Sequence, residues 1–78
     1  MLLSKKKVFN TLIEKFNRHM NEYELAERQN SDHYKAIVSD RMQETVHMAS
    51  QMRSKNIIRQ EQYNVLYDMH IKFARSKA

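Results

Sequence analysis

Apolar residues recur at three- and four-residue steps along almost the whole chain. At 100° per residue, this spacing places them on one face of an α-helix. The first such stripe consists of Phe9, Leu12, Ile13, Phe16, Met20 and Tyr23. It predicts a helix over residues 4–28, in which the hydroxyl of Ser4 can accept a free amide hydrogen of the first turn.

A second stripe alternates steps of four and three residues, as in the seam of a helical bundle. It consists of Tyr34, Val38, Met42, Thr45, Ala49 and Met52, and it predicts a helix over residues 32–54. Between the two stripes lies a polar cluster that predicts a turn. There, Asn30 tolerates the left-handed conformation that ends a helix, and Ser31 can cap the helix that follows.

Residues 54–58 interrupt the second stripe and predict a short connection to a third helix over residues 60–75. If Arg59 is the N-cap residue, Ile58 and Tyr63 have the spacing of a hydrophobic staple. The third stripe consists of Tyr63, Leu66, Tyr67, His70 and Ala74. Burial of His70 at the centre of this stripe would lower the pKa of its imidazole.

Two short connections favour antiparallel neighbouring helices. We therefore expect an all-α fold, a small up-down-up three-helix bundle that forms a single domain over residues 1–78. The alternative is a long helical hairpin that dimerises to complete its core. It stays open because no Gly or Pro marks either turn.

The composition narrows the possible functions. The chain of 78 residues contains no Gly, Pro or Cys. Without Gly, phosphate-binding loops, nucleophile elbows and Rossmann turns are disfavoured. Without Cys, disulfide frameworks, Cys-ligated zinc and thiol nucleophiles are excluded. We therefore expect a protein that is not an enzyme and that uses no cofactor.

Metal and membrane sites are also not expected. The one Glu-x-x-His match is Glu44 with His47, whereas a di-iron bundle needs two such motifs. No uninterrupted apolar run exceeds three residues, far below the roughly 20 residues of a membrane span. We expect a cytoplasmic protein without a metal site.

The charge balance indicates a surface that attracts anions. There are 14 Lys and Arg against 9 Asp and Glu, a net charge of +5. An up-down-up bundle brings the start of the first helix, the end of the second and the start of the third to one pole. The basic residues expected there are Lys5, Lys6, Lys7, Arg53, Lys55 and Arg59. They could meet phosphates or an acidic protein surface, or they could simply keep the protein in solution.

Two further sets of residues suggest contacts with macromolecules. Met48, Val65, Met69 and Leu25 lie at the margins of the stripes, where flexible apolar side chains suit adaptable protein interfaces. Gln60, Gln62 and Asn64 lie in the first turns of the third helix, where a recognition helix would contact bases.

In its small size, basic charge, lack of Cys and helical pattern, the chain is similar to small proteins encoded by phages and other mobile elements. It is similar in the same general way to bacteriocin-immunity bundles. We expect a non-enzymatic regulatory protein that binds another protein, with a homodimer as one possible form. The alternative is a DNA-binding transcriptional regulator that uses the basic pole or the start of the third helix.

Overall fold

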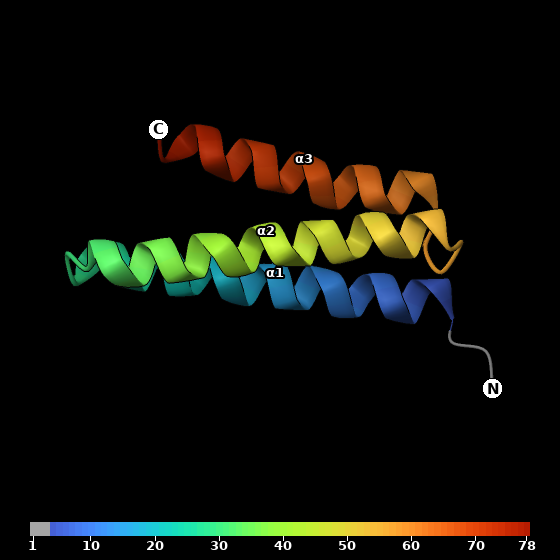
Figure 1. The fold of residues 1–78 in the computed structure, drawn as a ribbon, viewed down its shortest axis with the longest axis horizontal. Coiled ribbons are helices and arrows are strands. Elements are labelled where there is room, and N and C mark those ends of the chain that lie inside the picture. Colours follow the sequence, from blue (N-terminus) through green and yellow to red (C-terminus); the bar gives the residue numbers. More distant parts are fainter. Residues whose placement is uncertain (1–3) are drawn as a thin grey trace.

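The computed structural model describes residues 4–78 and shows three helices joined by two short turns (Figure 1). These are α1 (Lys5–Arg28), α2 (Asp32–Ser54) and α3 (Gln60–Ser76). Successive helices run in opposite directions, so the expected up-down-up three-helix bundle is confirmed. The alternative fold, a long helical hairpin, is not formed, because α3 folds back along the other two helices.

Both turns depend on an asparagine in the left-handed conformation. Asn30 has a φ of 53° and Asn56 a φ of 61°. In each turn the residue after the asparagine donates its amide hydrogen to the carbonyl oxygen five positions earlier, at 2.9 and 2.8 Å. This is the Schellman arrangement, in which glycine is the usual residue. Asparagine also adopts this conformation at modest cost, so a chain without glycine can still end its helices sharply.

The three helix starts are capped differently. The Ser31 hydroxyl accepts the amide hydrogen of Tyr34 at 3.2 Å, as the sequence predicted. Ser4 is the residue before α1, but its side chain makes no capping hydrogen bond. At α3, the side-chain oxygen of Gln62 accepts the backbone amide of Arg59 at 2.8 Å.

One apolar core runs between the helices, and α2 contributes the largest share of it. Its buried members are Leu12, Phe16, Val38, Met42, Val46, Ala49, Ile58 and Leu66. Ile58 is 1% exposed, and the nearby Tyr63 packs against the same core, as expected for a staple. Within α3 the one fully buried residue is Leu66.

The rotation of α3 about its axis differs from the prediction. Tyr67 is 46% exposed and Ala74 is also exposed, so neither lies in the core. Met69 and Phe73 pack against the core instead. The Phe73 ring meets Tyr23 of α1 edge to face, with centroids 5.4 Å apart. That aromatic contact accompanies a rotation of α3 that carries Tyr67 and Ala74 outward.

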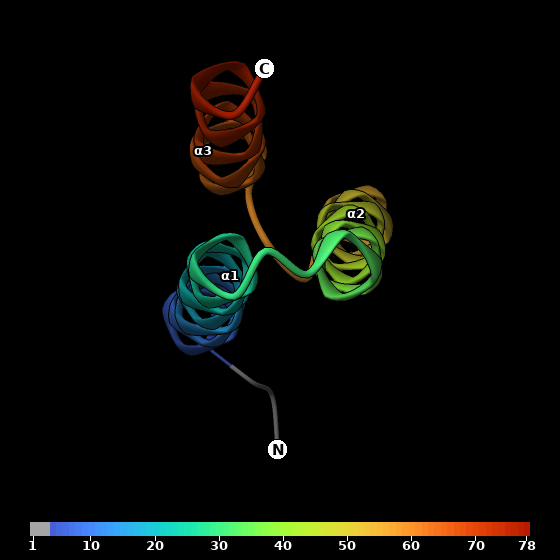
Figure 2. The same ribbon diagram turned by 90° about the vertical axis from the view of Figure 1, so that its left-hand side faces the viewer.

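The arrangement of the helices leaves one side of the α1–α2 pair uncovered. α1 packs most extensively against α2, whereas α3 makes fewer contacts with either. Viewed from the end, α3 lies over one side of the α1–α2 pair (Figure 2). Within residues 4–78, no helix combines the length and apolar character needed to cross a bilayer.

Candidate functional site

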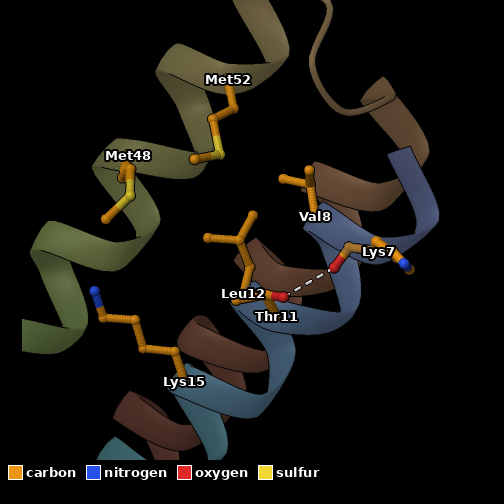
Figure 3. A pocket seen from close by; sticks show the side chains of 7 residues that line it. All are labelled: Lys7, Val8, Thr11, Leu12, Lys15, Met48 and Met52. Carbon is orange, nitrogen blue, oxygen red and sulfur yellow. Dashed lines mark hydrogen bonds between the residues drawn. The ribbon is translucent and has the colours of Figure 1, made fainter. Parts of the chain in front are cut away.

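An apolar groove runs between α1 and α2 on the side away from α3 (Figure 3). Its volume is about 390 Å³. We call it the α1–α2 groove, and its lining residues are Lys7, Val8, Thr11, Leu12, Lys15, Met48 and Met52. None of these residues belongs to α3, so the groove is a surface that α3 leaves open.

Apolar side chains from both helices form the groove. Val8 and Leu12 come from α1, and Met48 and Met52 come from α2. Leu12 is almost fully buried, whereas the other three are partly exposed to solvent. The Thr11 hydroxyl donates to the Lys7 carbonyl oxygen at 3.0 Å, so its proton is already satisfied. The groove therefore offers a ligand mainly apolar contact.

Two lysines border this apolar surface. The Lys15 side chain reaches across toward α2 below Met48, whereas Lys7 turns its ammonium group outward (Figure 3). Among the described residues, neither lysine forms an ion pair. Long lysine side chains lie along apolar surface while the charge stays in water. The border of the groove is therefore positively charged and free to meet an acidic ligand.

The groove continues along the two helices into a more polar hollow of about 390 Å³. We call this hollow the polar extension, and its lining residues are Lys15, His19, Glu22, Arg41, Glu44, Thr45 and Met48. It shares Lys15 and Met48 with the apolar groove. At a rise of 1.5 Å per residue, the distance along α1 from Lys7 to Glu22 is about 22 Å.

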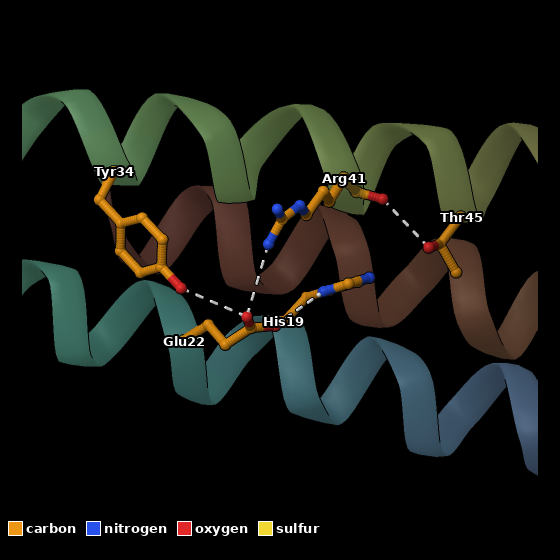
Figure 4. A network of polar contacts seen from close by, with 5 residues as sticks. All are labelled: His19, Glu22, Tyr34, Arg41 and Thr45. Atoms are coloured by element: carbon orange, nitrogen blue, oxygen red, sulfur yellow. Dashed lines mark hydrogen bonds and ion pairs between the residues drawn. The ribbon is translucent and has the colours of Figure 1, made fainter.

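A hydrogen-bonded network centred on Glu22 joins α1 to α2 in the polar extension (Figure 4). One carboxylate oxygen lies 3.1 Å from Nδ1 of His19. The other accepts the Tyr34 hydroxyl at 3.4 Å and lies 3.7 Å from the Arg41 guanidinium. The Thr45 hydroxyl donates to the Arg41 carbonyl oxygen at 3.0 Å. Both carboxylate oxygens of Glu22 therefore already have partners within the protein.

His19 is a buried polar residue that was not predicted to lie in the core. It is 7% exposed, and its Nε2 is buried without a hydrogen-bond partner. The signal was present in the spacing, because His19 continues the run of four- and three-residue steps from Leu12 through Phe16 toward Tyr23 and Ala26. His19 was not included in the predicted stripe because that stripe was drawn from apolar residue types only.

The start of α1, the end of α2 and the start of α3 lie at one end of the bundle, where the basic pole was predicted (Figure 1). Lys5, Lys6 and Arg59 surround one hollow of about 690 Å³, together with Ser4, Glu61 and Gln62. The Lys5 ammonium donates to the side-chain oxygen of Asn56 at 2.9 Å. The other three predicted residues lie outside this hollow: Lys7 borders the α1–α2 groove, Lys55 is exposed at the end of α2, and Arg53 faces α3.

Arg53 is held by contacts within the protein. Its guanidinium carbon lies 4.9 Å from the centre of the Tyr63 ring, and it donates to Gln60 Oε1 at 3.1 Å. Cation–π contacts of this kind help to fix a side chain at a surface. Arg53 therefore supports the packing of α3 on α2.

The three residues predicted to contact bases make hydrogen bonds at the start of α3. Gln60 donates to the side-chain oxygen of Asn64 at 2.7 Å, while its own oxygen accepts from Arg53. Gln62 accepts the backbone amide of Arg59. These side chains would have to give up their present hydrogen bonds before they could contact a base. The net free energy gained from such a contact is therefore smaller.

The four predicted protein-interface residues lie in different environments. Met48 lines both the α1–α2 groove and its polar extension. Leu25 is 41% exposed on α1 and Val65 is 50% exposed on α3. Met69 packs against the core. Of these four, Met48 is the one placed in the groove.

His70 lies where α3 faces the other two helices. Its ring meets Phe16 edge to face at 5.9 Å, and its Nδ1 is buried without a hydrogen-bond partner. Burial lowers the pKa of His70 below its ordinary value of 6.5, in the predicted direction. A neutral imidazole therefore fits this site better than a charged one.

Within residues 4–78, no three His, Asp or Glu side chains are grouped closely enough to hold a metal ion. No protein-family model, curated protein or solved structure matches the chain. The surface chemistry is therefore the remaining guide to function, and the α1–α2 groove is a largely apolar feature of that surface.

Proposed function

We propose that this chain is a non-enzymatic binding protein and that another protein docks in its α1–α2 groove. The observation that carries the proposal is the groove itself, because α3 covers one side of the α1–α2 pair and leaves this apolar side open. Apolar surface rimmed by polar residues is one of the features that protein interaction sites share. Burying it would contribute roughly 25 cal/mol for each Å² of apolar surface removed from water.

The residue types in the groove support this proposal. Met48 and Met52 lie side by side on α2 and are both partly exposed. Unbranched thioether side chains adjust their shape to an incoming surface at little cost, and they are common where one site accepts varied apolar contacts. A groove lined by two methionines therefore suits a protein partner.

Site-specific photo-crosslinking in the native host tests the proposal. A photoreactive amino acid replaces Thr11 at the groove or, as a control, the exposed Asn17 elsewhere on α1. We expect the Thr11 position to form a covalent adduct with another protein and the Asn17 position to form none. Absence of an adduct at Thr11, or the same adducts at both positions, would contradict the proposal.

A second candidate function is binding to DNA through the hollow at the end of the bundle that Lys5, Lys6 and Arg59 line. It is supported by Lys5, Lys6 and Arg59 around one hollow, near the N-termini of α1 and α3. Helix N-termini favour phosphate groups. A mobility shift on duplex DNA that weakens from about 50 to 200 mM salt and is lost on Lys6→Ala with Arg59→Ala would support it. An unchanged shift in that double variant would exclude phosphate contact at this hollow.

A further inference from the structure

We infer that the partner segment in the α1–α2 groove is an amphipathic helix whose apolar face is bordered by acidic residues. This inference rests on the proposed function and adds the chemistry of the partner. The groove and its polar extension follow α1 for about 22 Å, the length of a helix of about 15 residues. α3 already packs along the opposite side of the same pair, so a docked helix would repeat that arrangement on the open side.

The positive charges at the border of the α1–α2 groove favour a partner segment with negative charge. Lys7 and Lys15 are separated by eight residues on α1, a rise of about 12 Å. Neither forms an ion pair with a described residue. Two acidic residues seven or eight positions apart on one face of a helix have nearly the same rise. Apolar residues between them, at three- and four-residue steps, would meet Met48 and Met52.

The polar extension gives the docked helix a preferred direction. The Glu22 carboxylate already contacts His19, Tyr34 and Arg41. Glu44 is exposed at the same hollow and forms no ion pair within residues 4–78. The end of the partner helix that lies over Glu44 should therefore carry a basic residue, and the acidic end should lie over Lys7.

A second copy of this chain fits the groove less well than an acidic helix does. When two grooves pair with their α1 helices facing each other, Lys7 and Lys15 of each copy lie against the same lysines of the other. Like charges in contact across an interface are unfavourable. An acidic partner replaces this repulsion with attraction.

Binding of designed helical peptides tests the inference. An acidic peptide of about 16 residues carries apolar residues at helical spacing, two glutamates eight positions apart and a lysine at the far end. A matched basic peptide has lysines in place of the two glutamates. Fluorescence anisotropy measures the binding of each labelled peptide to the wild-type protein. We expect the acidic peptide to bind about tenfold or more tightly than the basic one.

Charge reversal on the protein provides the matched control. In the variant Lys7→Glu with Lys15→Glu, we expect the peptide preference to invert. The variant Lys72→Glu with Arg75→Glu changes the net charge equally but lies on α3, away from the groove, and it should keep the wild-type preference. Far-UV circular dichroism on both variants establishes that the helices remain folded.

Several results would overturn the inference. Equal affinity for the two peptides, or the same loss in both variants, would show that the groove lysines do not select the partner. Dimerisation that blocks peptide binding would assign the groove to a second copy. Binding to phosphatidylglycerol vesicles that needs Lys7 and Lys15, without peptide binding, would assign it to a lipid surface. If neither peptide binds but Thr11 still crosslinks to a protein, this inference fails while the proposed function stands.

Discussion

Truncating Leu66 to alanine tests how α3 is attached to the rest of the bundle. Leu66 is 0% exposed and is the one fully buried residue within α3. Removing most of a buried leucine side chain costs about 2–5 kcal/mol, depending on how far the surroundings relax. A chain of this length has a free energy of unfolding of about 4–12 kcal/mol. The substitution should therefore remove a large part of the total stability.

Urea unfolding followed by far-UV circular dichroism measures this loss. The control is Val65→Ala, because the neighbouring Val65 is 50% exposed and its truncation should cost about 0.5 kcal/mol or less. We expect the midpoint urea concentration of Leu66→Ala to fall well below those of the wild type and the control. A loss below about 1 kcal/mol, or one equal to that of Val65→Ala, would refute the account of how α3 packs.

Three further substitutions test local features of the fold. Asn30→Ala should lower the free energy of unfolding by about 1–2 kcal/mol, because alanine resists the left-handed conformation of this residue. Asn30→Gly should not lower the free energy of unfolding, and thermal melts compare the two variants. Ser31→Ala should cost about 1 kcal/mol in the same assay and Ser4→Ala almost nothing, since only Ser31 caps its helix through its side chain. The lowered pKa of His70 means that the unfolded chain binds the proton more readily, so stability should fall as the pH drops below about 6.5. His70→Leu should flatten that part of the pH profile measured by urea unfolding, and an unchanged slope would contradict the burial of His70.

The sequence was sufficient to predict the helices and their turns. The start of α1 and the end of α3 differ from the predicted bounds by one residue each. Local chemistry explains this success, because Asn30 and Ser31 act within a few residues of where they stand. The connection after α2 was predicted by its interrupted stripe, although the left-handed Asn56 within it was not.

The rotation of α3 was predicted wrongly although the spacing favours the observed one. At 100° per residue, Phe73 lies within about 20° of Leu66 around the helix axis, whereas Tyr67 lies about 100° away from it. The predicted stripe included Tyr67 and did not include Phe73. In the structure the Phe73 ring packs against Tyr23 of α1.

The α1–α2 groove was not predicted from the sequence. Leu12 and Met52 belong to stripes that predict a core, and nothing local shows that α3 covers only one side of the α1–α2 pair. Met48 was expected at an interface, and it lines the groove. Lys7 was assigned to the basic pole, and its place at the border of the groove was not foreseen.

The methionine methyl groups offer the most direct test of binding in the groove. The protein is labelled with carbon-13 at its methionine methyl groups and titrated with the acidic helical peptide. Met48 and Met52 line the groove, whereas Met42 is buried in the core and Met69 packs against it from α3. We predict that the resonances of Met48 and Met52 shift on binding while those of Met42 and Met69 stay nearly unchanged. Shifts at Met42 or Met69 with Met48 and Met52 unaffected would contradict the proposal that the partner docks in this groove.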